Sequence, residues 1–232
     1  MIELTWDSDF FNKRIGRIED KNDYANLVEN LEKAFKQKYD LVYIFGDKNT
    51  DIPNQILTKF NGKLVDRKIT YTAQIEDLKT KNTVEIKEFE EKNANLLYEL
   101  AYLSGKYSRF KLDEGIEIAN FKRLYREWID KSVSHQIAKK VFVYNENGQI
   151  MGMITLGVKE KVANIGLIAV DETLQGKGIG MSLIDACVRY CKAENIITLD
   201  VPTQLDNTQA CIFYEKCGFT LKSVQNIYHF WA

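Results

Sequence analysis

The segment "ANIGLIAVDETLQGKGIGMSLIDACVRYCKA", residues 163–193, decides the fold. A strand-like apolar run leads into a loop that holds Gly176, Gly178 and Gly180, and an apolar stripe at helical spacing follows at once. Glycine lets backbone amides approach a ligand closely, and a helix start adds unpaired N–H groups and a positive dipole end. The chain has only 13 glycines in 232 residues, so three in one loop predict an anion-binding site.

The spacing of these glycines excludes two familiar phosphate loops. A Walker loop fails because Asp171 stands in place of its first glycine and Gly178 in place of its Ser or Thr. A Rossmann loop fails because Met181 and Leu183 stand where its third glycine would fall. The pattern that fits is Q-x-x-G-x-G at 175–180. The alternative is a plain strand-to-helix turn that needs glycine.

A second motif, "NTQACIFYEKCGF" at 207–219, lies downstream of the glycine loop. Asn207 is well placed as a helix N-cap, and Tyr214 lies two turns later on the same side, so both side chains can face a ligand. Gly218 and Phe219 then open the next predicted strand. Taken alone, Tyr214 would more simply be a core aromatic residue with a satisfied hydroxyl.

Together, the two motifs resemble the glycine loop and the C-terminal signature of the GNAT superfamily of acyl-CoA N-acyltransferases. The elements predicted from residue 81 onward follow the GNAT order of strand, two helices, three strands, helix, strand, helix and closing strands. The resemblance implies an α/β (α+β) fold with a mixed, largely antiparallel twisted sheet flanked by helices. We expect a GNAT domain at 81–232 and a small N-terminal α/β unit at 1–80, because the polar break "KTKN" follows that unit's last predicted strand.

The resemblance also implies an acetyl-CoA-dependent N-acetyltransferase that works by direct attack in a ternary complex. The expected coenzyme contacts are Ile168, Ala169, Val170, Gln175, Gly176, Lys177, Gly178, Ile179, Gly180, Asn207 and Tyr214. Tyr214 is the expected general acid, because a phenol with a pKa near 10 can protonate the leaving thiolate. No general base is named, since a sugar amine can lose its proton to water. Glu172 and Gln175 depart from the proline and arginine of many relatives but leave the backbone amides in place.

Other stretches narrow the resemblance to the dTDP-fucosamine acetyltransferase type, among them the opening "LTWDSDFFNKRIGRIE", "YSRFKLD" and "FKRLYREWIDKSV". That type acetylates the 4-amine of a dTDP-4-amino-4,6-dideoxyhexose, which implies a nucleotide-linked amino sugar as partner and a role in surface polysaccharide biosynthesis. Arg109 would then pair with the diphosphate, and Tyr107 or Phe110 would stack on the base or sugar. Gln204 is a further hydrogen-bonding candidate. The alternatives are a local salt bridge for Arg109 and core packing for the aromatic residues.

The composition argues against several other classes of protein. The chain has 32 Lys and Arg against 33 Asp and Glu, so no basic excess argues for nucleic acid. No apolar run approaches the ~20 residues of a membrane helix, and the opening carries acids where a signal peptide would carry bases. We therefore expect a cytoplasmic protein with no membrane partner. Cys187 and Cys191 are interpreted as core thiols and His135 and His229 match no catalytic arrangement, so no metal is expected.

Two rival functions stay open. One is a GNAT enzyme with another amine acceptor, such as a protein N-terminus, a polyamine or an antibiotic. The other is a non-catalytic module that senses CoA or a nucleotide sugar, against which the intact glycine loop and Tyr214 argue. The sequence leaves open which amino sugar and nucleotide are bound, whether the acyl group is acetyl, and whether the protein is a homodimer.

Overall fold

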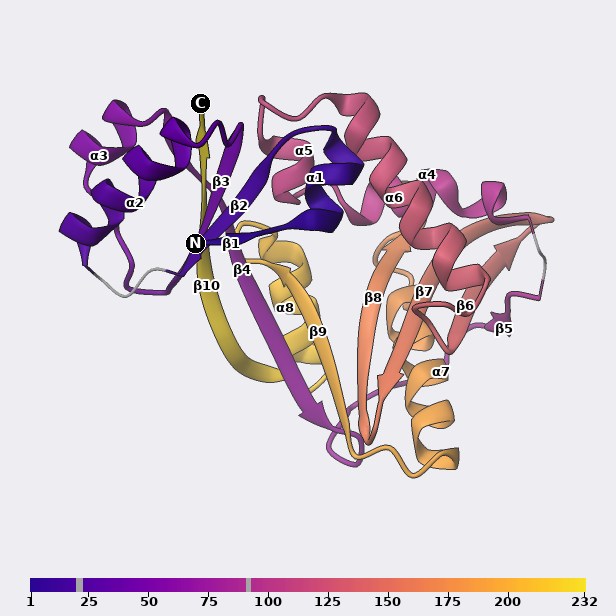
Figure 1. The fold of residues 1–232 in the computed structure, drawn as a ribbon. Coiled ribbons are helices and arrows are strands. Elements are labelled where there is room, and N and C mark those ends of the chain that lie inside the picture. Colours follow the sequence, from indigo (N-terminus) through magenta and orange to yellow (C-terminus); the bar gives the residue numbers. More distant parts are fainter. Residues whose placement is uncertain (20–22, 91–92) are drawn as a thin grey trace.

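The computed structural model describes residues 1–19, 23–90 and 93–232, and in these ranges the chain forms one ten-stranded sheet flanked by helices (Figure 1). The order across the sheet is β1-β2-β3-β10-β4-β9-β8-β7-β6-β5. The strands are β1 (Ile2–Glu3), β2 (Ile15–Glu19), β3 (Leu41–Asp47), β4 (Gly62–Gln74), β5 (Lys87–Glu88), β6 (Lys140–Glu146), β7 (Gln149–Lys159), β8 (Val162–Val170), β9 (Thr198–Gln204) and β10 (Thr220–Trp231). Two pairs, β2 with β3 and β8 with β9, are parallel and the others are antiparallel, which confirms the predicted fold class.

The helices lie on both faces of this sheet. They are α1 (Thr5–Phe11), α2 (Tyr24–Lys36), α3 (Asn54–Lys59), η1 (Ala94–Leu97), α4 (Tyr98–Ser104), α5 (Arg109–Leu112), α6 (Ile118–Val133), η2 (Glu172–Leu174), α7 (Ile179–Ala193) and α8 (Thr208–Lys216). The sequence did not predict β1, α1 or α5. The sequence also predicts a strand at "RIGRIED", 14–20, whose last residue, Asp20, lies outside the described residues.

Strand β3 shows how the helices divide between the faces. It is a continuous apolar run, as expected of a strand that is covered on both sides. Its Leu41 and Tyr43 belong to the core cluster of α4 and α6, whereas Val42 and Ile44 pack with α2 on the opposite face. Side chains alternate along a strand, so one apolar run supplies both cores.

The stretch "NLVENLEKAFKQK" at 26–38 predicts a helix, and the structure has α2 at Tyr24–Lys36. Asp23 caps α2 by accepting a hydrogen bond from the Asn26 amide, and the helix buries Leu27, Leu31 and Ala34 against the sheet. Helix α7 buries an apolar stripe that includes Cys187 and Cys191, which also explains the four-residue spacing of these cysteines.

The hairpin of β6 and β7 turns at Asn147 and Gly148, whose φ angles are 52° and 82°. Positive φ at both central residues is the requirement of the tight hairpin turn that asparagine followed by glycine favours. The sequence "NENG" at 145–148, between two apolar runs, predicts such a tight turn, and the structure confirms it.

Strand β4 differs most from the expected organisation. It comes from the predicted N-terminal unit, yet it lies between β10 and β9 in the middle of the sheet. The chain's end forms one twelve-residue strand, β10, where the sequence predicted closing strands. The division at residue 80 thus stays a prediction about chain organisation, because the hydrogen-bonded sheet continues across it.

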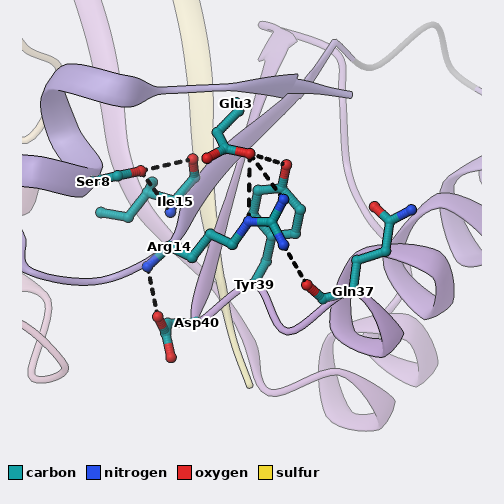
Figure 2. A network of polar contacts seen from close by, with 7 residues as sticks. All are labelled: Glu3, Ser8, Arg14, Ile15, Gln37, Tyr39 and Asp40. Carbon is teal, nitrogen blue, oxygen red and sulfur yellow. Dashed lines mark hydrogen bonds and ion pairs between the residues drawn. The ribbon is translucent and has the colours of Figure 1, made fainter.

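The beginning of the chain is attached to the sheet by a polar network (Figure 2). Arg14 donates to Glu3 Oε2 at 3.0 Å and to the Gln37 carbonyl at 2.6 Å, and its guanidinium lies 4.2 Å from the Tyr39 ring centroid. Ser8 exchanges hydrogen bonds with the backbone of Ile15. The arginine and glutamate are nearly half exposed, so the pair stabilises the fold only modestly, whereas the Ser8 hydrogen bonds hold α1 to the start of β2.

Candidate functional site

The parallel strands β8 and β9 pair at one end and then diverge (Figure 1). Their described pairing covers residues 162–164 of β8 and 198–200 of β9. Beyond it, β8 continues to pair with β7, and β9 with β4. The facing edges of 165–170 and 201–204 therefore carry backbone groups with no strand between them, which is a site for an extended ligand.

A cleft of about 1230 Å³ opens at this divergence. We call the part next to the glycine loop the loop half; it is lined by 165–170, 174–176, 178–181, 201–204, Asn207, Ala210, Phe213 and Tyr214. We call the other part the charged half; it is lined by Trp6, Asp7, Arg17, Phe45, Asp66, Lys68, Tyr107, Ser108, Arg109, Phe110, Tyr125, Trp128, Gln225 and Ile227. Every predicted site residue lines this cleft except Lys177, which is exposed outside it.

Glycine stands at each of the three loop positions for a different structural reason. Gly176 has φ of +79°, and a Cβ there would meet nothing within 4 Å, so its side faces open space. Gly178 has φ of +83° and caps α7, and a Cβ there would lie 2.6 Å from Thr83 Oγ1. Gly180 lies inside α7, where a Cβ would come within 3.2 Å of the Phe213 ring. The first two need glycine for backbone conformation, and at the third a side chain would crowd the Phe213 ring of α8.

The loop is tied to the strand before it and to α8. Gln175 Nε2 donates to the Val170 carbonyl at 3.2 Å, and Gln209 Nε2 donates to Gln175 Oε1 at 3.1 Å. Helix α7 begins directly after the loop, so its first-turn amides, which have no intrahelical acceptors, lie at the cleft. Such amides and the helix dipole favour an anionic group.

Tyr214 lies deep in the loop half. The N-cap predicted at Asn207 is confirmed, since its side chain accepts from the Ala210 amide at 3.2 Å. Tyr214 is 3% exposed, and its ring centroid lies 5.9 Å from that of Tyr71 and 5.8 Å from that of Phe219. Burial raises the pKa of Tyr214 above its ordinary value, so the phenol keeps its proton at neutral pH.

Arg109 in the charged half is held by rings. Its guanidinium carbon lies 4.3 Å from the ring centroid of Tyr43 and 4.6 Å from that of Phe110. Within the described ranges, no carboxylate oxygen lies within 4.0 Å of it, so the alternative of a local salt bridge does not account for its position. Asp7 and Asp66 do act on it through longer-range attraction. The cation stays available at the wall of the cleft.

A buried chain of polar contacts lies behind Arg109. Asp113 accepts hydrogen bonds from His229 Nδ1, from Trp231 Nε1 at 3.0 Å and from the Gly115 amide at 2.9 Å, and these donors hold the pKa of Asp113 below its ordinary value. Burial lowers the pKa of His229 to about 4, so its ring is neutral. Nε2 can then accept from Arg109 Nη1 at 3.5 Å. His229 matches no catalytic arrangement in the sequence, but the structure places it behind Arg109.

The sequence also missed the acidic and basic residues of the charged half. Asp66 and Lys68 lie two apart on β4 and face the cleft, and Arg17 and Phe45 approach from β2 and β3. The only local signal was a carboxylate within a strand-like run, which alone cannot tell which face of the strand is buried. Trp6 and Asp7 reach the cleft from α1, a helix that the sequence did not predict.

The cysteines are buried and not disulfide-bonded. Burial raises the pKa of Cys187 well above its ordinary value and that of Cys191 to about 11, so both stay thiols at neutral pH. Across the described residues, no group of three His, Cys, Asp or Glu side chains could hold a metal ion. In the same ranges, no helix is long and apolar enough to span a bilayer.

Known proteins resemble this chain in sequence and fold. The spore coat polysaccharide biosynthesis protein SpsD of Bacillus subtilis strain 168 is 26% identical over 133 residues, which cover 57% of this chain and 46% of that protein. The streptothricin acetyltransferase of Escherichia coli is 34% identical over 77 residues, which cover 33% of this chain and 44% of that protein. The chain thus spans about half the length of the curated relatives it matches.

A crystal structure of a functionally unknown conserved protein from Staphylococcus epidermidis ATCC 12228 has the same fold. It superposes with a TM-score of 0.65 at 15% identity and covers 94% of this chain and 84% of its own. Residues 107–219 match the acetyltransferase (GNAT) family. The chain has the GNAT fold, and the segment that matches this family, whose members use acetyl-CoA, includes the glycine loop, the start of α7 and Tyr214.

Proposed function

We propose that this protein transfers the acetyl group of acetyl-CoA to the amine of a nucleotide-linked amino sugar, with the 4-amine of a dTDP-4-amino-4,6-dideoxyhexose as the expected acceptor. The observation that carries the proposal is the continuity of one cleft from the glycine loop past Tyr214 to the charged half. Acetyl-CoA and acceptor can meet in such a cleft without leaving it, as direct transfer requires.

The loop half fits acetyl-CoA. The unpaired facing edges of β8 and β9 offer backbone donors and acceptors to the amide-rich pantetheine arm, with 168–170 as its expected contacts. The amides of 175–180 at the start of α7 suit the pyrophosphate, and Asn207 would help to position the coenzyme. Lys177 lies outside the cleft lining and would add only charge from the rim.

Tyr214 is the proposed general acid. Its raised pKa keeps the phenol protonated, so it can give its proton to the CoA thiolate when the tetrahedral intermediate collapses. A backbone N–H of β8 beside the thioester would stabilise the oxyanion of that intermediate.

The charged half suits a nucleotide-linked sugar. Arg109, Arg17 and Lys68 supply positive charge for a diphosphate, and the rings of Trp6, Phe45, Phe110 and Trp128 supply apolar surface for a base or sugar. Tyr107 lines the charged half and is proposed to stack on the base or sugar, and Gln204 at the end of β9 is the proposed hydrogen-bonding partner. The similarity to a spore coat polysaccharide biosynthesis protein supports a sugar acceptor. The cytoplasmic location and a homodimer stay predictions.

A second acceptor class has some support. The similarity to streptothricin acetyltransferase raises the prospect of an antibiotic amine as acceptor. The two classes differ in charge, since a nucleotide sugar brings an anionic diphosphate to Arg109 and a basic antibiotic does not.

The test is thiol release from acetyl-CoA with a panel of amines: dTDP-4-amino-4,6-dideoxygalactose, its gluco epimer, a 3-amino isomer, a UDP-linked 4-amino sugar, spermidine, a peptide amine and streptothricin. We expect turnover confined to a dTDP-4-amino sugar. Turnover only with spermidine, peptide or streptothricin would remove the nucleotide-sugar assignment and leave acetyl transfer standing. Tight binding of acetyl-CoA by calorimetry, without thiol release for any amine, would favour the sensor.

A further inference from the structure

Asp66 is a buried carboxylate in the wall of the cleft. It lies on β4 and is 8% exposed. Its cross-strand neighbour Ile227 lines the cleft, as does Lys68 two residues along the same face of β4. The side chains of Asp66 and Arg109 therefore face one ligand space, which also contains the carboxyl end of β9 at Gln204.

Asp66 lacks the partners that a buried carboxylate needs. Its Oδ1 atom is buried and has no hydrogen bond with any described group. A buried acceptor without a partner is destabilising, so structures normally supply one. In contrast, the buried Asp113 nearby accepts three N–H groups. The missing donor at Asp66 points to a ligand that brings its own N–H.

The groups around Asp66 come from several elements. Arg109 of α5 and Lys68 of β4 attract the carboxylate, Asp206 after β9 repels it, and Tyr125 of α6 lies within electrostatic range. Burial outweighs both cations and raises the pKa of Asp66 to about 7. A group with such a pKa can take up and release a proton near neutral pH.

We propose that Asp66 binds the ammonium group of the acceptor and takes its proton, so that it acts as the general base of the acetyl transfer. The inference rests on the proposed function. It assigns a catalytic task to the N-terminal part of the chain, through a strand that lies in the middle of the sheet.

The proposed step conserves atoms and charge. The acceptor R–NH₃⁺ gives one proton to the Asp66 carboxylate and becomes R–NH₂, whose lone pair attacks the thioester carbon. The C–N bond forms and the C–S bond breaks. The departing thiolate takes a proton from Tyr214, and the second proton lost by nitrogen restores the tyrosine. Asp66 then releases its proton to solvent, so the products are the amide, CoA–SH and one H⁺.

Other groups near the cleft are less suited to this task. Glu172 is paired with Lys106 at 3.0 Å and is largely exposed. His229 is fully buried, and both its ring nitrogens are engaged by Asp113 and Arg109. Asp7 is held on the outer helix α1, whereas Asp66 lies on the central strand next to β9.

The first test compares Asp66→Asn with wild type by thiol release, using dTDP-4-amino-4,6-dideoxygalactose and hydroxylamine as nucleophiles. At about pH 7 the sugar amine is protonated and hydroxylamine is neutral, so we expect a loss of about 100-fold with the sugar and less than about tenfold with hydroxylamine. Raising the pH should restore the variant's rate with the sugar. An equal loss with both nucleophiles, or a rate within about threefold of wild type with the sugar, would overturn the proposal.

Glu172→Gln is the matched control. Glu172 also lines the cleft but is largely exposed and paired with Lys106, so its loss removes a cleft carboxylate other than Asp66. We expect its rates to stay within about twofold of wild type for both nucleophiles.

A second measurement needs no turnover. In protein carrying ¹³C-labelled aspartate, the carboxyl signal absent from Asp66→Asn should titrate near pH 7 and shift when the dTDP-4-amino sugar is added. Titration in the ordinary carboxyl range, or no shift with the sugar, would contradict the proposal whether or not wild type turns over. Calorimetry with acetyl-CoA tests the proposed function separately, because loss of that binding would remove acetyl transfer without moving the Asp66 titration.

Discussion

The loop half and the charged half of the cleft are built from different parts of the chain and in different ways. The loop half comes almost wholly from 165–214 and offers mainly backbone, from the open edge of β8 to the first turn of α7. The charged half collects side chains from α1, β2, β3, β4, α5, α6 and β10. Backbone recognition needs only a local pattern of strand, glycine and helix, whereas side-chain recognition needs distant segments brought together.

The largest effect should come from the acid that stands at the deep end of the loop half. Tyr214→Phe should lower kcat about 10²- to 10³-fold, because the thiolate must then leave without a proton, while the acetyl-CoA Kd stays within about threefold. Thiol release and calorimetry measure the two quantities.

Tyr71→Phe is the control for packing around Tyr214. The two rings are neighbours, and the Tyr71 hydroxyl donates to Glu215 at 2.8 Å instead of serving the cleft. If both variants lose the same activity, Tyr214 contributes packing and the acid must be sought elsewhere.

The next prediction tests whether each half of the cleft binds a different ligand. Arg109→Gln removes the cation of the charged half, so the KM for the nucleotide sugar should rise about tenfold to a hundredfold while the acetyl-CoA Kd is unchanged. Arg67→Gln, which breaks an exposed pair with Asp206, should leave both constants near wild type. A parallel weakening of acetyl-CoA binding in Arg109→Gln would show that the halves are not independent.

A smaller effect should test backbone recognition in the loop half. Gly176 and Gly148 have φ of +79° and +82°, and a Cβ at either position meets nothing within 4 Å. Replacing either by alanine should cost about 1 kcal/mol of unfolding free energy, because L residues disfavour this conformation. Only Gly176→Ala should also weaken acetyl-CoA binding, about tenfold, since Gly148 lies in the β6–β7 turn outside the cleft lining. Equal acetyl-CoA affinity in the two variants would count against the loop as the pyrophosphate site.

The last effect is on stability and concerns the free-energy cost of keeping Asp66 buried in the charged half. The pKa of Asp66 is raised from 3.8 to about 7, so the folded state binds more protons than the unfolded state between those values, and stability falls as pH rises through this range. Asp66→Asn cannot ionise. Its unfolding free energy should therefore exceed that of wild type by on the order of 1–3 kcal/mol above about pH 7, with the difference vanishing near pH 4.

Chemical denaturation at a series of pH values measures this difference. A gain of the same size at all pH values would assign it to packing, and a loss above pH 7 would mean that the Asp66 carboxylate has a stabilising partner.

Much of the fold could be predicted because its signals are local. The N-cap at Asn207, the Asn147–Gly148 turn and the buried stripe of α7 each depend on residues within a few positions of one another. The short helices α1 and α5 escaped prediction, since one or two turns carry too few residues to show a period.

The sequence by itself determined the loop half: the apolar strand, the glycines and the capped helix that follow one another from 163 to 214. Only the tertiary structure decided the charged half. Strand β4 enters the sheet between β9 and β10, which brings Asp66 to Arg109 and Arg109 to His229, 120 residues further along the chain. Strand pairing is chosen by the packing of both sheet faces together, and no pattern within β4 states which strands will flank it. The loop half, which uses backbone groups, can therefore be predicted from one segment. The charged half, which uses side chains, exists only once the sheet has formed.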